Sequence, residues 1–179
     1  MTRVAGSVAE YEGAGPFLAS GLRSGDRYEL SNGHAFYCAP RGADVARAIL
    51  VGAQVLGTDP AVTEAGIDAG YSFGPRHLRA PDIAIGNVPD LPGWIAGAPP
   101  LAVEYAGSGQ DEAKLQEKIA DLIGAGTRWI WVVRLLGPRR VEIHEADVQG
   151  RILACRDLAL LDGWLERAIE AKSLADVMG

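Results

Sequence analysis

The first part of the chain contains several short apolar runs, and the spacing of apolar residues differs from one run to the next. The run at residues 17–22 predicts a brief helix at the edge of the fold. Between residues 27 and 40, two apolar runs flank Asn32-Gly33, and Asn-Gly in this position is the strongest short signal for a β-hairpin. We therefore expect two antiparallel strands before the first long helix.

The first long helix is predicted over residues 44–56. Its apolar positions repeat at helical spacing, which indicates a helix that a sheet largely covers; they are Val45, Ala48, Ile49 and Val55. Gly57 is expected to end this helix. The Gly-rich stretch 66–74 is ambiguous, and we interpret it as a strand interrupted by a bulge.

A second helix is predicted over residues 110–123, because apolar residues again gather on one face: Leu115, Ile119, Leu122 and Ile123. Ser108 and Asp111 are spaced as an N-terminal capping pair, and glycines follow the helix as a stop signal. Apolar runs predict further strands around this helix, at 81–86, 101–106, 128–134 and 140–145, and a last strand and helix within 151–178.

The order of these elements predicts an α/β fold in which helices flank a mixed sheet. The sequence contains no internal repeat and no low-complexity tract, so we expect one domain over residues 1–179. Residues 1–26 are rich in glycine, alanine and serine, and they are expected to be a peripheral segment of that domain.

Composition narrows the class of protein. The chain is 48% hydrophobic and 22% charged, as is typical of a globular domain. Two cysteines, Cys38 and Cys155, cannot make a disulfide framework or a four-ligand zinc site. The net charge of −6 excludes a protein that coats nucleic acid through bulk positive charge, although a local basic site remains compatible with it.

The same sequence gives no sign of a membrane or secreted protein. No stretch approaches about 18 uninterrupted apolar residues, so we expect no transmembrane span. Residues 1–15 lack the apolar core and cleavage site of a secretory signal, so a cytoplasmic location is expected.

Two carboxylates stand out inside the apolar strands. Because side chains alternate across a strand, Asp82 should share a face with Ala84, and Glu104 should share a face with Ala102 and Ala106. If the two strands are neighbours, both carboxylates would border a shallow pocket whose base is formed by small residues. A carboxylate in an apolar strand is costly unless it is paired or binds a metal ion.

The second helix offers two cations. A rotation of about 100° per residue places Lys118 at the edge of the apolar stripe and Lys114 farther round the helix. The stem of Lys118 could therefore follow the stripe and present its ammonium to the carboxylates, with Lys114 as a second, accessory candidate. Two carboxylates suit Mg²⁺, with Mn²⁺ as a substitute, and a nearby lysine can stabilise charge on a phosphate, so the set suits phosphodiester hydrolysis.

Four segments of the chain, in this order and spacing, resemble the Uma family, a branch of the PD-(D/E)XK nuclease superfamily. The segments are YELSNG, APDIAIG, PPLAVEY and KIADLIGAGTRWIWVV, and they span about residues 28–134. The family typically has Pro-Asp before a strand, Val-Glu at a strand end, and a lysine fourteen residues later in a helix that ends in Ala-Gly. Lys118 lies fourteen residues after Glu104 in this sequence.

The resemblance implies a restriction-endonuclease-like fold and a Mg²⁺-dependent endonuclease that acts on DNA. It implies that Asp82 and Glu104 hold the metal ion and that Lys118 is the catalytic lysine. Ala106 stands where the superfamily usually has its lysine, and the family's shift of the lysine to the helix agrees with the rotation argument. Glu29 matches an early family element and is an accessory candidate, either near the metal ion or as a support of the hairpin.

Two alternatives to the nuclease stay open at this point. The chain could be a catalytically decayed relative that keeps the fold for binding or assembly, which the acidic net charge favours. A serine hydrolase that uses Ser108 is a more remote reading, since the segment lacks the outer glycines of a nucleophile elbow. A homodimer is expected for this type of fold, whereas the target sequence and biological role are not written in the residues.

Overall fold

The strands of this computed structural model divide between two five-stranded sheets, where the sequence predicted one mixed sheet. The structure describes residues 15–146, so the strand and helix expected within 151–178 lie outside it. Both sheets are mixed, because each contains one parallel pair of strands among antiparallel ones. The mixed α/β class is confirmed, with two α-helices, one short 3₁₀ helix and two sheets in the described part.

The first sheet has the order β2-β1-β5-β4-β7. Its strands are β2 (His34–Tyr37), β1 (Tyr28–Ser31), β5 (His77–Arg79), β4 (Tyr71–Gly74) and β7 (Ile95–Ala96). The predicted hairpin is confirmed as β1 and β2, with both turn residues at positive φ, 50° at Asn32 and 84° at Gly33. A short helix, η2 (Ala19–Gly21), buries Ala19 against this sheet.

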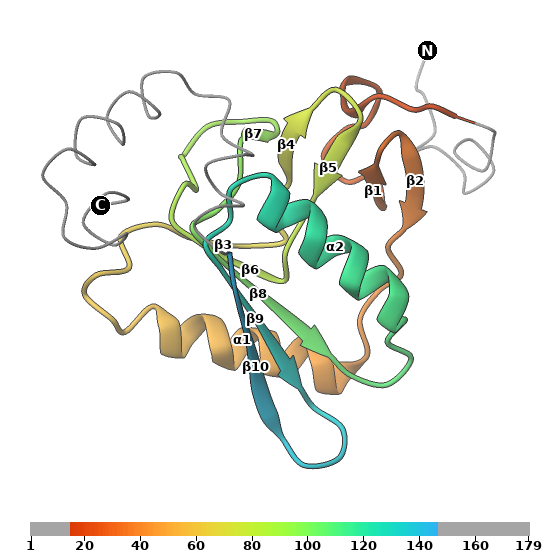
Figure 1. The fold of residues 1–179 in the computed structure, drawn as a ribbon. Coiled ribbons are helices and arrows are strands. Elements are labelled where there is room, and N and C mark those ends of the chain that lie inside the picture. Colours follow the sequence, from red (N-terminus) through yellow and green to blue (C-terminus); the bar gives the residue numbers. More distant parts are fainter. Residues whose placement is uncertain (1–14, 147–179) are drawn as a thin grey trace, which may run out of the picture.

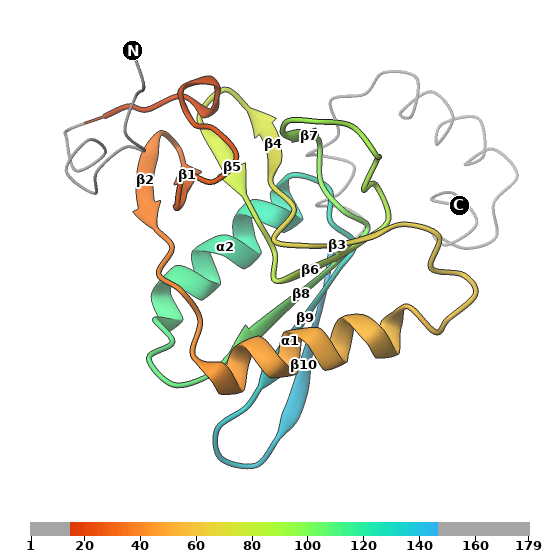
Figure 2. The ribbon, with the colours of Figure 1, turned by 180° about the vertical axis from the view of Figure 1, so that it is seen from behind.

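The second sheet has the order β10-β9-β8-β6-β3 and carries the candidate site. Its strands are β10 (Arg140–Glu145), β9 (Trp129–Arg134), β8 (Leu101–Ala106), β6 (Ile83–Ile85) and β3 (Ala65–Ile67). Strand β8 is central, because it pairs with β6 in antiparallel fashion and with β9 in parallel. The two long helices lie on opposite faces of this sheet (Figures 1 and 2).

Helix α1 (Ala43–Leu56) covers one face of the second sheet. It packs Val45 and Ile49 against an apolar cluster on the strands, Ile83, Val103 and Tyr105. The prediction that Val55 belongs to the covered face is wrong, since Val55 is 63% exposed. At about 100° per residue, Val55 lies about 80° from Val45, whereas the half-buried Leu56 lies only about 20° away.

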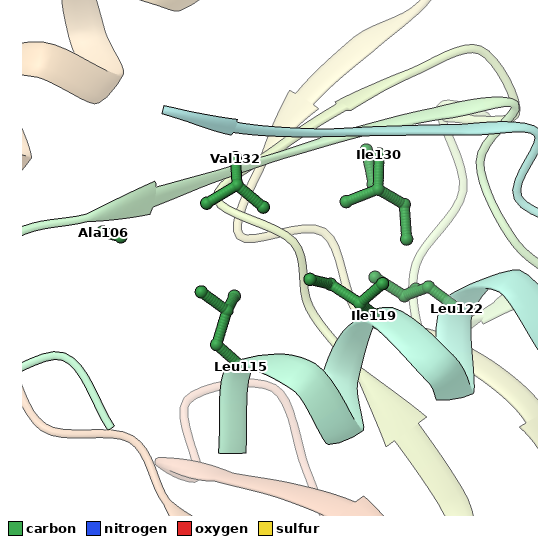
Figure 3. Close-up of a cluster of buried hydrophobic side chains, with 7 residues drawn as sticks. Ala106, Leu115, Ile119, Leu122, Ile130 and Val132 are labelled. Atoms are coloured by element: carbon green, nitrogen blue, oxygen red, sulfur yellow. The ribbon is translucent and has the colours of Figure 1, made fainter. Parts of the chain in front are cut away.

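Helix α2 (Glu112–Gly124) covers the other face of the second sheet. Its apolar side chains point towards the strands in Figure 3, where Leu115, Ile119 and Leu122 meet Ala106, Ile130 and Val132. Small alanines on β8 let the helix approach the sheet closely. The N-terminal cap of α2 is Asp111 and not Ser108. The Asp111 carboxylate accepts the backbone N–H of Lys114 at 3.2 Å, whereas Ser108 is exposed.

The Gly-rich stretch 66–74 forms parts of two strands rather than one, and the expected irregularity is present in β4, whose register with β5 shifts between Tyr71 and Gly74. It contains the end of β3 and all of β4, which belong to different sheets, and the chain turns between them through Asp68 at a φ of 55°. The short strands β5 and β7 were not predicted from the sequence. Within residues 15–146, neither helix has the length and apolar character needed to cross a membrane.

Candidate active site

Asp82 and Glu104 lie on neighbouring strands. Ile83 pairs with Val103 in the antiparallel ladder of β6 and β8, so Asp82, one residue before β6, falls opposite Glu104. Both carboxylates point to the side of the sheet that α2 covers, and both are buried, with 2% and 3% exposure. The expected neighbouring strands and shared small-residue face are therefore present.

The two oxygens of Asp82 have different partners. Oδ2 accepts the backbone N–H of Tyr105 at 2.7 Å, which fixes the carboxylate against β8. Oδ1 lies 2.6 Å from Nη2 of Arg41, in the loop between β2 and α1. The sequence analysis did not single out Arg41, because nothing in the local pattern ties this loop to β6.

Lys118 reaches the carboxylates from α2. Its Nζ lies 3.0 Å from Oε1 of Glu104 and 3.0 Å from Oε1 of Glu29, and it donates to the carbonyl oxygen of Ala80 at 2.6 Å. The side chain is buried against the apolar stripe of the helix, with the ammonium at its end. Three acceptors thus surround one ammonium group.

Burial and charge shift the pKa values of this pair. Burial lowers the pKa of Lys118, but Glu104, Glu29 and Asp82 outweigh this effect and raise it, so the ammonium stays charged. Burial, with help from Asp82 and Glu29, raises the pKa of Glu104 to about 8 although Lys118 opposes the shift. Burial therefore makes Glu104 harder to ionise than a free glutamate, while the carboxylates around Lys118 keep its ammonium charged.

A second buried cation, Arg79 of β5, contacts the far side of Glu29 from Lys118. Its guanidinium lies 3.3 Å from Glu29 and 2.7 Å from Asp121 of α2, and it covers the ring of Phe36 at 5.0 Å. Glu29 therefore bridges Lys118 and Arg79, which ties the first sheet to α2. The sequence analysis did not single out Arg79; its position three residues before Asp82 was the available signal.

Two other candidates are not brought to the site. Lys114 is 61% exposed and lies 3.6 Å from Asp111, at the start of α2 and away from Glu104. Ser108 is exposed in the loop between β8 and α2, and it makes no side-chain hydrogen bond to any residue of the described range. Neither residue belongs to the cluster of Asp82, Glu104 and Lys118.

The donor set fits an ion that keeps most of its water. Within residues 15–146, no group of three or more His, Cys, Asp and Glu side chains is arranged to hold a metal ion. The pair of Asp82 and Glu104 supplies two hard oxygen donors, and Asp82 Oδ1 already binds a cationic group. Mg²⁺ is commonly held by one or two carboxylates and several waters, so the residues fit this ion.

A solved structure has a similar fold. The crystal structure of a putative nuclease belonging to DUF820, from Anabaena variabilis ATCC 29413, aligns with a TM-score of 0.52 and 18% sequence identity. The alignment covers 66% of this chain and 76% of that chain. No protein-family model and no curated protein matches the sequence. The chain therefore shares the fold of this DUF820 protein.

Proposed function

We propose that the chain is a divalent-metal-dependent nuclease that hydrolyses phosphodiester bonds in DNA. The fold shared with the DUF820 protein supports a nuclease, and the sequence resemblance supports membership of the Uma family. The observation that carries the proposal is the meeting of Asp82, Glu104 and Lys118 at one point of the second sheet.

In this proposal each residue has a defined role. Asp82 and Glu104 would hold Mg²⁺, which supplies a polarised phosphate oxygen and a water of lowered pKa when bound. Lys118 keeps its charge between two carboxylates, so its ammonium can stabilise negative charge that develops on the phosphate. Tyr105 N–H orients the Asp82 carboxylate, and Glu29 holds Lys118 from the other side.

A second candidate, a nuclease-fold protein that binds without cleaving, is favoured by one observation. In the structure, each proposed metal ligand already faces a side-chain cation, Arg41 at Asp82 and Lys118 at Glu104. A site that has lost its metal would be stabilised by such ion pairs. Titration calorimetry with Mn²⁺ separates the candidates, because only the nuclease is expected to give binding heat that Asp82→Asn abolishes.

Cleavage of supercoiled plasmid DNA with Mg²⁺ or Mn²⁺ tests the nuclease. Asp82→Asn, Glu104→Gln and Lys118→Met should each lower the rate by roughly 10²–10⁴-fold. Lys114→Met is the matched control, since it removes an exposed lysine four residues earlier on the same helix and should leave the rate unchanged. Circular dichroism confirms that each variant is folded. Equal rates in all variants, or full activity in a chelator, would end the assignment.

A further inference from the structure

Arg41 and Asp82 form an unequal ion pair. The Arg41 side chain is 43% exposed, whereas the Asp82 side chain is almost wholly buried. Arg41 stands directly before Gly42, the N-terminal cap of α1, so its side chain leaves from a loop and reaches inward to the sheet. A long solvent-exposed side chain thus neutralises a buried carboxylate.

The Asp82 oxygen that Arg41 contacts is the one free to bind a cation. Tyr105 N–H occupies Oδ2 from the backbone of β8, so Oδ1 alone turns towards Arg41. Among the ion pairs of residues 15–146, Arg41 is the one cation within 4.0 Å of Asp82. A divalent ion bound to Oδ1 would therefore occupy space beside the same oxygen and repel the guanidinium.

The field at Arg41 is negative from more than one side. Burial lowers the pKa of the Arg41 guanidinium, but Asp82, Glu104 and Asp68 together outweigh it and raise the pKa. The guanidinium thus lies in a negative field from all three carboxylates, a place that would attract any small cation. Asp68 follows β3 directly and is exposed, so the negative charge near Arg41 continues from the buried carboxylates to the surface.

Arg41 can leave this position at low cost, in contrast to Arg79. Arg79 is buried and held by Glu29, Asp121 and the ring of Phe36. Arg41 has Asp82 as its one ion-pair partner in the described residues, and nearly half of its side chain is in water. The half-exposed Arg41 guanidinium can return to water at little cost, whereas the buried Asp82 carboxylate needs another cation in its place. A divalent ion on Oδ1 would be that cation, and Arg41 could then bind another anion.

From these contacts we infer that Arg41 is a displaceable cation, which neutralises Asp82 until a divalent ion enters and then binds a phosphate oxygen of the nucleic acid. The inference rests on the proposed function, because it assumes a divalent ion on Asp82. The released guanidinium is suited to its second partner, since its planar fork donates two hydrogen bonds to a phosphate. Metal and phosphate binding are then coupled, and each tightens the other.

Calorimetric titration with Mn²⁺ tests the first half of the exchange. Arg41→Gln removes the competing charge and should bind Mn²⁺ roughly two- to fivefold more tightly than the wild type. Arg41→Lys keeps a positive charge and should stay near the wild-type affinity. Arg47→Gln is the matched control, because Arg47 is exposed on the adjacent α1 and makes no ion pair with any residue of the described range.

Fluorescence anisotropy with a short labelled DNA duplex tests the second half. The duplex carries phosphorothioate linkages, which keep the negative charge and resist hydrolysis. In Mn²⁺, Arg41→Gln should weaken duplex binding roughly tenfold relative to Arg47→Gln, as the loss of a charged hydrogen bond predicts. Without Mn²⁺ the two variants should bind the duplex equally, because Arg41 is then held by Asp82.

The outcomes separate this inference from the proposed function. Unchanged Mn²⁺ affinity in Arg41→Gln, or a loss of duplex binding that is the same with and without Mn²⁺, overturns the exchange while metal-dependent cleavage by the wild type still stands. Absence of Mn²⁺ binding in the wild type and in Arg41→Gln overturns both. Tighter Mn²⁺ binding together with Mn²⁺-dependent loss of duplex affinity supports the exchange.

Discussion

The ammonium of Lys118 lies 3.0 Å from the carboxylate of Glu104, and both groups are buried between α2 and the second sheet. Removing two charges from water costs several kcal/mol per ion, and their attraction offsets this cost only if further partners are present. Glu29 and the Ala80 carbonyl provide those partners for Lys118. The pair is therefore maintained as a unit, and each member depends on the other.

Replacing Lys118 alone should lower the free energy of unfolding more than replacing Lys118 and Glu104 together. Lys118→Met leaves Glu104 and Glu29 without their shared cation, which we expect to lower the free energy of unfolding by about 3–5 kcal/mol. The double variant Lys118→Met/Glu104→Gln removes one of the two carboxylates left without their cation and should recover part of that loss. Urea unfolding of the wild type, both single variants and the double variant measures the coupling. Additive losses would contradict the interdependence.

The raised pKa of Glu104 makes stability depend on pH in a defined direction. The unfolded chain loses this proton near pH 4.5, whereas the folded protein keeps it up to about pH 8. Between these values the folded state binds more protons, so the contribution of Glu104 to the free energy of unfolding should fall as pH rises, by up to about 1.4 kcal/mol per pH unit. Above pH 8 the contribution should stay constant.

The matched variant for this prediction is Glu104→Gln, which cannot ionise. Urea unfolding of the metal-free protein at pH 5, 6.5 and 8 should show the variant gaining stability relative to the wild type as pH rises. Parallel pH profiles for the two proteins would show that Glu104 is already ionised at pH 5.

Periodic patterns made the carboxylates predictable. Alternation along two strands placed Asp82 and Glu104 on the small-residue face, and helical rotation placed Lys118 ahead of Lys114; the structure has the same faces. These predictions needed only local geometry, because the period of a strand or a helix fixes which residues share a side.

Long-range contacts were not predictable in the same way. Glu29 and Lys118 are 89 positions apart, and no local pattern records that a hairpin residue meets the middle of α2. Arg41 and Arg79 were missed for the same reason, since a loop arginine and a strand arginine look alike until the sheets are assembled. The family resemblance pointed to Glu29, but it did not identify Arg79 as its second partner.

Arg79 should stabilise the protein through its ion pairs with residues of α2 and β1, and its loss should lower the free energy of unfolding. Arg79→Met leaves Asp121 and Glu29 without a buried partner, and we expect a loss of about 3–5 kcal/mol in the free energy of unfolding. Arg76→Met is the control, because Arg76 is exposed in the turn before β5 and should change stability by less than about 0.5 kcal/mol. Denaturant unfolding at pH 7 measures both; similar values would show that Arg79 is not a buried anchor.

The close approach of α1 to β8 at Gly52 should be sensitive to a single methyl group. A Cβ at Gly52 would overlap the hydroxyl oxygen of Tyr105 and lie 3.0 Å from its Cζ, and the Tyr105 ring is buried. Gly52→Ala should therefore destabilise the protein, since overpacking costs about 1–3 kcal/mol and exceeds the roughly 1 kcal/mol gained in helix propensity. Gly124→Ala is the control, because a Cβ there meets nothing within 4 Å and should stabilise α2 slightly.

The hydroxyl of Tyr105 gives this last prediction a direct check. In a Tyr105→Phe background the overlapping oxygen is absent, so Gly52→Ala should cost less than it does in the wild type. Thermal unfolding of the four proteins of this cycle measures the difference. An equal cost in both backgrounds would mean that the helix shifts as a whole, and that the Tyr105 hydroxyl does not set the distance between α1 and the strand that carries Glu104.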